Sequence, residues 1–219
     1  MKNIAIDGPA GAGKSSIAKL VAKNLGIVYV DTGAMYRTMA LACLRDGVDT
    51  SDEQAVSKKV GDVEISIEYI DGAQHIFLGT DDVSSEIRQE EVGKNASLIA
   101  RYAFVRSKLV SIQQELATRQ DVIMDGRDIG TVVLPDAYLK VFLTASSKVR
   151  AQRRYKELVE KGVECDIDEI EKDIIARDEQ DMNREVSPLK QADDAVLVDT
   201  SDMSIDQVVS RIMELYNAD

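Results

Sequence analysis

The sequence feature that most constrains the fold is a glycine-rich stretch near the N-terminus. It reads Gly8-Pro9-Ala10-Gly11-Ala12-Gly13-Lys14-Ser15 and matches the pattern G-x-x-x-x-G-K-[ST]. Glycine tolerates positive φ, so the backbone of such a loop wraps closely around an anion and points successive N–H groups at it. The lysine adds a positive charge for the β- and γ-phosphates of a nucleotide, and the serine hydroxyl can bind Mg²⁺. The stretch therefore predicts a loop that binds a nucleoside triphosphate.

The residues on either side supply the strand and the helix that such a loop requires. Ile4–Ile6 is a short apolar run typical of a buried strand, and Ser15–Leu25 carries apolar residues at helical spacing. On its own, the pattern could also be a Gly/Ala-rich turn before a helix. The order strand, loop, helix favours phosphate binding, because the positive end of the helix would face the bound anion.

Composition argues against several classes of protein. The formal net charge is −12 and the isoelectric point is near 4.7, whereas nucleic-acid binders usually show a basic surface. The two cysteines, Cys43 and Cys165, form neither a disulfide framework nor a metal-binding spacing. The N-terminus lacks the pattern of a signal peptide, and no apolar run is long enough to span a bilayer. We expect a monomeric cytoplasmic protein without nucleic-acid or membrane partners, folded as one domain with insertions.

Further apolar runs predict parallel strands whose ends carry polar residues. These runs are 27–30, 122–125, 139–143 and 195–200. Because ligands of open α/β sheets bind beyond the carboxyl ends of the strands, Thr32 and Arg37 are placed near the glycine-rich loop. Asp31-Thr32 alone is also a common helix N-cap. Asp125 ends its strand as the Mg²⁺-binding Asp of phosphate-loop enzymes does, so Ser15 and Asp125 are the predicted metal ligands.

A segment with a different pattern interrupts these α/β elements. Residues 63–69 alternate apolar and polar side chains, Asp71-Gly72 is a turn signal, and residues 75–79 supply a hairpin partner. A third short strand is expected at 82–83, and helices are expected at 36–60 with a break near 47–49, at 85–98 and at 105–119. His75 is the only histidine. Its place on the hairpin favours an exposed strand residue over a catalytic one.

Two predicted helices in the C-terminal half carry arginines at helical spacing. Residues 147–161 place Arg150, Arg153 and Arg154 on one face, where like charges repel unless an external anion relieves them. Residues 170–183 lead to a second set, whose members are Arg177, Asp181 and Arg184. A charged exposed stripe is the alternative for the first set. An exposed salt-bridge ladder explains the second set equally well, although exposed ion pairs add only about 0.3–0.5 kcal/mol each. The polar segment 162–168 between the helices is a candidate closing lid.

These features predict an α/β fold: a P-loop NTPase-type parallel sheet flanked by helices, with an inserted small antiparallel subdomain and a helical lid. Several arginines around one triphosphate site favour phosphoryl transfer to a second phosphate-bearing ligand. The sequence resembles the bacterial-type cytidylate kinases, a branch of the nucleoside monophosphate (NMP) kinases, over essentially the whole chain. The matching stretches are Ile6–Ser15, Asp31–Arg37, Asp125–Val133, Arg177–Asp181, Asn183-Arg184 and Pro188-Leu189, together with the insertion at 62–83. Asp125–Val133 is the most specific of them.

The resemblance implies transfer of the γ-phosphoryl group of ATP to CMP or dCMP, giving ADP and CDP or dCDP. The implied CMP-binding residues are Thr32, Arg37, Ser97, Arg106, Arg127, Asp128, Arg177, Asp181 and Arg184. Within this set, Ser97, Arg106 and Asp128 would read the cytosine edge, and Asp181 would contact the sugar hydroxyls. Many relatives carry serine at the position of Thr32, which keeps the hydroxyl group.

The resemblance also implies an ATP site with Mg²⁺ as the cofactor. Its residues would be Gly8, Pro9, Ala10, Gly11, Ala12, Gly13, Lys14, Ser15, Ser16 and Arg153. The implied catalytic residues are Lys14, Arg127, Arg150, Arg154, Arg177 and Arg184. The expected organisation is core at 1–38, an NMP-binding insertion at 39–104, core at 105–147, a lid at 148–168 and core at 169–219.

Two alternatives remain open. Another small-molecule kinase on the same scaffold, with UMP, AMP or a non-nucleotide acceptor, would share the loop. The Gly126-Arg127-Asp128 block and the long insertion argue against it. A regulatory nucleotide switch would need a guanine-reading N-K-x-D element, which the sequence lacks, and arginine-rich helices suit rapid transfer better than a held state.

Overall fold

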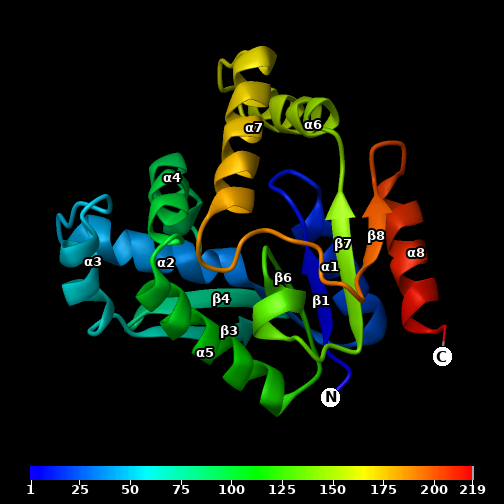
Figure 1. Cartoon of the computed structure of the whole chain (residues 1–219), viewed down its shortest axis with the longest axis horizontal. Coiled ribbons are helices and arrows are strands. Elements are labelled where there is room, and N and C mark those ends of the chain that lie inside the picture. The colour runs from blue at the N-terminus through cyan, green and yellow to red at the C-terminus, as the bar shows by residue number, and fades with distance from the viewer. Residues whose placement is uncertain (219) are drawn as a thin grey trace. The chain divides into compact units, whose positions relative to one another are not determined.

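The computed structural model describes residues 1–218, which form two compact units (Figure 1). The first unit combines Met1–Tyr29 with the chain from Ala117 onward, and the second unit is Val30–Leu116. The second unit therefore begins before and ends after the insertion expected at 39–104. Within the described residues, no helix is both long and apolar enough to cross a membrane.

A parallel sheet forms the centre of the first unit. Its strands are β1 (Ile4–Asp7), β2 (Val28–Asp31), β6 (Val122–Gly126), β7 (Leu139–Thr144) and β8 (Val196–Asp199), in the order β2-β6-β1-β7-β8. β1 pairs in parallel with both β6 and β7, and β7 pairs in parallel with β8. The apolar runs predicted these strands because a parallel sheet is usually covered on both faces. The P-loop NTPase-type sheet expected from the sequence is confirmed.

Helices α1 (Lys14–Leu25) and α8 (Ile205–Tyr216) build the core of the first unit against this sheet. Ile17 and Val21 of α1, and Ile212 of α8, are buried in one cluster with the apolar side chains of β1 and β7. α1 ends at Gly26, which has φ +66° and donates its N–H to the carbonyl of Ala22. This is the helix stop that the sequence predicts, since glycine adopts positive φ without a Cβ clash.

Helices α6 (Ser147–Glu160) and α7 (Ile167–Asn183) pack on each other beyond the carboxyl ends of β1 and β7 (Figure 1). Ser146 caps α6 by accepting from Val149 N–H, and Asp166 caps α7 by accepting from the N–H groups of Asp168 and Glu169. Because of the Asp166 cap, α7 begins earlier than the expected residue 170. The polar segment between the helices is correspondingly shorter than 162–168.

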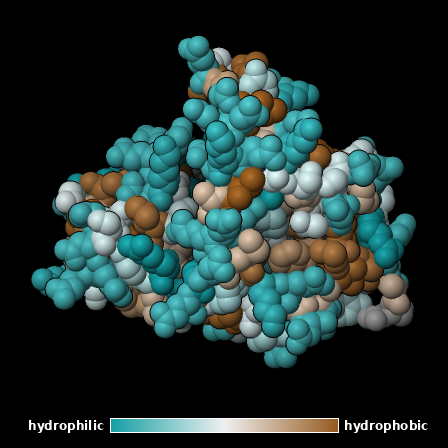
Figure 2. Space-filling model, turned by 45° about the horizontal axis from the view of Figure 1, so that its top comes forward, coloured by the Kyte–Doolittle hydropathy of each residue, from teal (hydrophilic) through white to brown (hydrophobic). Residues whose placement is uncertain are grey.

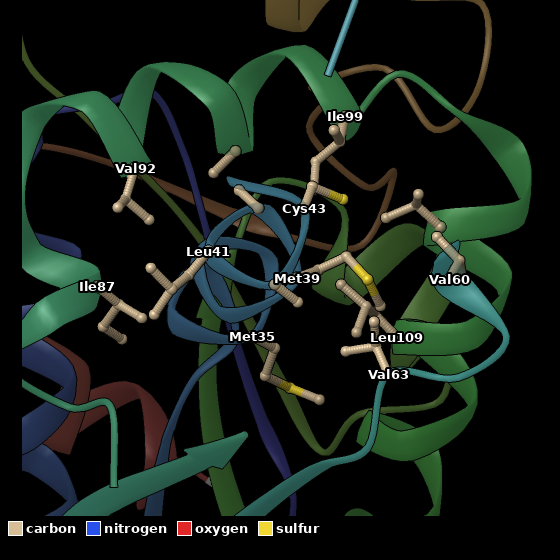
Figure 3. Packing of buried hydrophobic residues seen from close by; sticks show 14 of the residues in the cluster. Met35, Met39, Leu41, Cys43, Val60, Val63, Ile87, Val92, Ile99 and Leu109 are labelled. Atoms are coloured by element: carbon tan, nitrogen blue, oxygen red, sulfur yellow. The ribbon is translucent and has the colours of Figure 1, made fainter. Parts of the chain in front are cut away.

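The second unit is built around α2 (Thr32–Arg45). Its other elements are α3 (Glu53–Val60), the antiparallel strands β3 (Ile65–Ile70), β4 (Ala73–Leu78) and β5 (Asp81–Asp82), the 3₁₀ turn η1 (Glu86–Arg88), α4 (Glu90–Ile99) and α5 (Ala103–Arg119) up to Leu116. Met35 and Met39 of α2 are fully buried, and Figure 3 shows them among side chains of α3, α4 and α5. The predicted antiparallel hairpin is confirmed, with Ile67 opposite Ile76.

Three further elements differ from the sequence expectation. The helix expected at 85–98 is divided at Gln89, whose extended backbone (φ −63°, ψ 144°) ends η1 and precedes α4. The first helix of the second unit begins at Thr32 because Asp31 caps it. The loop expected after Asp125 continues into a π-helix, η2 (Ile129–Val133), which no local pattern announced.

The visible surface is mainly hydrophilic, in keeping with the acidic composition (Figure 2). The helix pair α6–α7 also exposes apolar side chains, and Val159, Val163 and Ile175 are 50%, 46% and 43% accessible. Scattered apolar residues of this kind are common on soluble proteins, so they indicate no particular partner.

Candidate active site

The glycine-rich loop has the backbone geometry that the sequence predicts. Gly8, Gly11 and Gly13 all have positive φ, at 147°, 75° and 89°. A Cβ added to Gly8 would lie 1.9 Å from the carbonyl oxygen of Leu143 in β7, so only glycine fits where the loop leaves β1. A Cβ at Gly11 would meet Arg150 at 3.3 Å. The loop is thus packed closely against β7 and α6.

Lys14 begins α1 directly after the loop and is 6% exposed. Its Nζ donates to the carbonyl oxygen of Pro9 at 2.8 Å. Burial, and next the charge of Arg127, lower the pKa of Lys14 to about 7, while Asp125, Asp7 and Asp181 oppose the shift. A polyphosphate bound here would favour the charged ammonium, because an adjacent anion stabilises a cation.

Ser15 and Asp125, the predicted metal ligands, lie side by side. The Ser15 hydroxyl donates to Asp125 Oδ2 at 2.8 Å, and the phenol of Tyr29 donates to Asp125 Oδ1 at 2.9 Å. Hydroxyl and carboxylate oxygens suit Mg²⁺, which commonly uses one or two protein oxygens plus substrate phosphates and water. Residues 1–218 contain no group of three or more His, Cys, Asp or Glu side chains arranged to hold a metal. The residues present therefore fit a nucleotide-bound Mg²⁺.

Asp7, at the end of β1, fixes the backbone that follows β6. Its two carboxylate oxygens accept the N–H groups of Ile129 and Gly130, each at 2.7 Å. Asp7 is only 5% exposed. The bonds tie the strand that enters the glycine-rich loop to the turn that presents Arg127 and Asp128.

The titration of Asp7 should be visible in the stability of the protein. Burial raises the pKa of Asp7 from 3.8 to about 6, against the opposing effect of the two N–H donors. Between these values the native state keeps a proton that the unfolded chain has released, so stability falls as pH rises. From pH 5 to 7 this one group should lower the unfolding free energy by about 1 kcal/mol.

Urea unfolding of the wild type and of Asp7→Asn at pH 5, 6 and 7 measures this contribution. Asparagine does not titrate, so the wild type should lose about 1 kcal/mol relative to the variant as pH rises. Asp136→Asn, at an exposed position of the same unit, should follow the wild type. Parallel curves for the wild type and Asp7→Asn would contradict the raised pKa.

Four charged residues of the first unit form a compact cluster. Arg127 Nε donates to Asp181 Oδ2 at 2.8 Å, and Arg184 lies 3.8 Å from Asp181 and 3.9 Å from Asp128. The Arg184 and Asp128 side chains are each 6% exposed. Burial alone would raise the pKa of Asp181, but the charge and hydrogen bond of Arg127, with the charges of Arg184 and Arg177, together outweigh burial and lower it. The charges of Arg127 and Asp181 also act on Lys14, where Arg127 lowers the pKa and Asp181 raises it.

Arg184 reaches this cluster from a turn and not from the helix. α7 ends at Asn183, and Arg184 has an extended backbone (φ −64°, ψ 142°), so the helical spacing suggested by the sequence does not extend to Arg184. The turn folds back because Arg184 Nε donates to the Ser187 carbonyl at 2.6 Å, and Leu189 N–H donates to the Asp181 carbonyl at 2.8 Å. Arg177 is exposed on α7, and its charge contributes to the lowered pKa of Asp181.

The three arginines of α6 bind acceptor groups of the protein itself. Arg150 donates to the carbonyls of Ala10 and Ala145 at 3.0 and 2.9 Å, and to Asp178 Oδ2 at 2.6 Å. Arg153 bonds the carbonyl and hydroxyl of Thr200, and Arg154 pairs with Glu157 at 3.0 Å. Acceptors within the protein therefore relieve the charge repulsion that we expected an external anion to relieve. Arg150 links the glycine-rich loop, through Ala10, to α7.

The remaining predicted residues belong to the second unit. Asp31 caps α2 by accepting from Ala34 N–H and also binds Arg37 at 2.8 Å, so its carboxylate orients Arg37 at the start of the helix. Thr32, the next residue, is 3% exposed. The N-cap interpretation of Asp31 is confirmed, and the cap leaves Thr32 and Arg37 in the first turns of α2.

Arg106 and Ser97 lie on the helices beside α2. Arg106 in α5 is 3% exposed, donates to the Ala100 carbonyl at 3.1 Å and lies 5.4 Å from the centre of the Tyr36 ring. The Ser97 hydroxyl in α4 points back to the Gly93 carbonyl at 3.4 Å. A buried guanidinium against an aromatic ring is a fixed cation, suited to holding an anionic or polar ligand.

Comparisons with known proteins identify the family of this chain. The model of the family described as cytidylate kinase matches residues 4–218. The chain belongs to the cytidylate kinase family. A curated cytidylate kinase from Leuconostoc mesenteroides subsp. mesenteroides is 52% identical over 212 residues, covering 97% of this chain and 95% of that protein. A cytidylate kinase from Exiguobacterium sibiricum is 50% identical, with 97% and 95% covered.

Solved structures agree with the fold at low sequence identity. A gluconokinase from Sinorhizobium meliloti 1021 has a TM-score of 0.51 at 14% identity, covering 99% of this chain and 91% of its own. A shikimate kinase from Bacteroides thetaiotaomicron has a TM-score of 0.50 at 16% identity, with 98% of both chains covered. These likenesses support the kinase fold that the cytidylate kinase family model and the parallel sheet already indicate.

Sequence reasoning missed several residues that shape this site. Asp7 and Tyr29 are absent from the predicted set, as are Asp31 as the partner of Arg37 and Asp178 as the partner of Arg150. Asp7 and Asp31 had a detectable signal, because each is a carboxylate at the end of an apolar strand. Tyr29 lies within the apolar run 27–30 and gave no such signal.

Proposed function

We propose that this member of the cytidylate kinase family transfers the γ-phosphoryl group of ATP to CMP or dCMP. The bond between the γ-phosphorus and the β–γ bridging oxygen breaks as a phosphate oxygen of the acceptor bonds to that phosphorus. The products are ADP and CDP or dCDP. The observation that carries the proposal is the largely buried cluster of Arg127, Asp128, Asp181 and Arg184. The charges of two of its members, Arg127 and Asp181, act on Lys14. The cluster supplies cations near the loop for a second phosphate and carboxylates for polar groups of a nucleoside.

The donor side of the proposal is the glycine-rich loop with Lys14. Its backbone N–H groups and the start of α1 would hold the ATP phosphates, and Lys14 would leave the Pro9 carbonyl to contact them. Ser15 and Asp125 would hold Mg²⁺, which neutralises charge on the phosphates. Ser16 and Arg153 complete the proposed ATP-binding set. Arg150 supports the loop through the Ala10 carbonyl, and Arg154 joins it in the proposed catalytic set.

The residues proposed for the acceptor side are described for each unit by itself. They are Arg127, Asp128, Arg177, Asp181 and Arg184 in the first unit, and Thr32, Arg37, Ser97 and Arg106 in the second. Arginine suits this task because its planar guanidinium binds two phosphate oxygens at once. The carboxylates are hydrogen-bond acceptors, so they can accept from the cytosine amino group and from sugar hydroxyls.

The proposed reaction needs no general base. The second pKa of a phosphomonoester is about 6, so the attacking oxygen of CMP is already largely ionised at pH 7. The rate then depends on alignment of the two phosphates and on stabilisation of the charge that moves between them. The single histidine, His75, is paired with Asp82 on the antiparallel sheet and takes no part in this proposal.

An acceptor panel tests the proposed function. With ATP and Mg²⁺, ADP release is measured for CMP, dCMP, UMP, AMP and no acceptor. We expect CMP or dCMP to give a kcat/KM at least about 10-fold above that of UMP or AMP, a difference of about 1.4 kcal/mol in transition-state binding. A preference for AMP or UMP would indicate the related-kinase alternative. No turnover with any acceptor would favour the nucleotide switch.

Asp128→Ala tests base recognition on the acceptor side. We expect kcat/KM for CMP to fall by about 10²-fold, because truncation leaves the partners of a buried carboxylate unpaired. KM for ATP should change less than about 3-fold. Asp136→Ala, at an exposed position of the same unit, is the matched control. A defect confined to ATP would contradict the proposed role of Asp128.

A further inference from the structure

Tyr29 connects the strand β2 to the proposed metal ligands. Its phenol is buried, at 9% exposure for the residue, and donates to Asp125 Oδ1 at 2.9 Å. Asp125 is 5% exposed, and its other oxygen, Oδ2, accepts from the Ser15 hydroxyl at 2.8 Å. One carboxylate thus receives a hydroxyl from each side, from β2 and from the first turn of α1.

The chemistry of these three groups determines where lone pairs remain. An ionised carboxylate only accepts, so both hydroxyl hydrogens are directed at Asp125. Ser15 has one O–H hydrogen, and giving it to Asp125 leaves the serine oxygen with lone pairs for a cation. The last torsion of an Asp side chain is broad, so a donor on each oxygen is what holds the carboxylate plane in one orientation.

We propose that Tyr29 is a positioning residue for the divalent cation, acting through Asp125 and Ser15. Its phenol keeps the carboxylate plane turned so that Oδ2 receives the Ser15 hydrogen. The Ser15 oxygen then presents its lone pairs to Mg²⁺ bound with the nucleotide. This inference rests on the proposed Mg²⁺-dependent phosphoryl transfer and adds a residue outside the glycine-rich loop to it. Outer partners of metal ligands commonly change metal affinity by about 10–100-fold.

The chain provides a matched control for removing the phenol oxygen. Tyr138, in the same unit, donates its hydroxyl to the backbone carbonyl of Tyr216 at 3.2 Å and packs edge-on against the Tyr216 ring. Tyr29→Phe and Tyr138→Phe each delete one phenol oxygen and one hydrogen bond. Only Tyr29→Phe changes a hydrogen bond to Asp125.

The test is equilibrium binding of a non-hydrolysable ATP analogue, the β,γ-imido triphosphate, by calorimetry. Each protein is titrated in excess Mg²⁺ and again in EDTA. We expect Tyr29→Phe to weaken binding in Mg²⁺ by about 10-fold and binding in EDTA by less than 2-fold. Tyr138→Phe should match the wild type in both conditions. Equal weakening in Mg²⁺ and EDTA would mean that Tyr29 supports the glycine-rich loop and not the cation site. Unchanged binding in both conditions would mean that Tyr29 supports neither the loop nor the cation site. Each result overturns the proposal.

A double-mutant cycle tests whether Tyr29 acts through Ser15. In a Ser15→Ala background, Tyr29→Phe should change the Mg²⁺-dependent binding less than about 2-fold, because the serine oxygen that Asp125 directs at the cation is gone. A full 10-fold effect in that background would overturn the proposed route. A wild type that binds the analogue equally well in Mg²⁺ and EDTA removes the Mg²⁺ role and this inference together. If the wild type shows the Mg²⁺ effect but no CMP phosphorylation, the acceptor assignment fails. The binding comparison of Tyr29→Phe in Mg²⁺ and EDTA then still tests the role of Tyr29, because it does not depend on the acceptor.

Discussion

Gly8→Ala is expected to lower the unfolding free energy by more than about 4 kcal/mol, an unusually large effect for adding one methyl group. The new Cβ would lie 1.9 Å from the carbonyl oxygen of Leu143. That oxygen belongs to the backbone of β7, which is paired on both edges, so it cannot move aside without loss of strand pairing. The φ of +147° adds strain, since alanine rarely adopts it. Urea unfolding followed by circular dichroism measures the loss.

Gly26→Ala is the matched control for this substitution. Gly26 also has positive φ, at 66°, but a Cβ there would meet no heavy atom within 4 Å. The cost should therefore be that of the left-handed backbone alone, about 1–2 kcal/mol. Similar losses for both variants would contradict the close approach of the loop to β7. In that case the shape of the glycine-rich loop would depend on backbone freedom alone.

Lys14→Ala is expected to reduce kcat by about 10²–10³-fold, because it removes a cation from the phosphates at which charge develops. The fold should persist. Deletion of a buried ammonium removes a desolvated charge, which offsets the lost hydrogen bond to the Pro9 carbonyl. The unfolding free energy should therefore change by less than about 1 kcal/mol. Steady-state kinetics with CMP and urea unfolding measure the two quantities on one protein sample.

Lys23→Ala provides the control, since Lys23 is an exposed lysine in the last turn of the same helix. Both kcat and KM should stay within about 2-fold of the wild type, because a surface lysine makes no contact with the phosphates. A folded Lys14→Ala protein with near-normal kcat would contradict the role given to Lys14. A defect of equal size in both variants would point to the helix and not to the site.

The parts of this site that the sequence could predict are those set by neighbours in the chain. The glycine-rich loop is defined by its own pattern and by the strand and helix that flank it. Gly26 stops α1 and Asp31 caps α2 through bonds to residues three or four positions away. In each case a short stretch of sequence contains the physical cause.

The parts that could not be predicted depend on contacts between distant residues. Asp7 and Ile129 are 122 positions apart, and Arg150 and Ala10 are 140 positions apart. Helical spacing suggested that Arg150 faces an external anion, whereas its guanidinium donates hydrogen bonds to acceptors within the protein. The π-helix after Asp128 is held by the Asp7 carboxylate, so no local propensity could announce it. The bonds from Asp7 follow from the register of β1 beside β6, which only the assembled sheet defines.

The most direct test of the account is whether one molecule fills a donor and an acceptor site together. The probe is a pentaphosphate that joins adenosine to cytidine, measured by calorimetry against the imido analogue of ATP and against CMP. We predict an affinity about 10²-fold or more above that of either single nucleotide, because the second site is bound at high effective concentration. The pentaphosphate that joins two adenosines should bind more weakly than the mixed compound. An adenosine–cytidine compound that binds no more tightly than the ATP analogue would contradict two adjacent nucleotide sites.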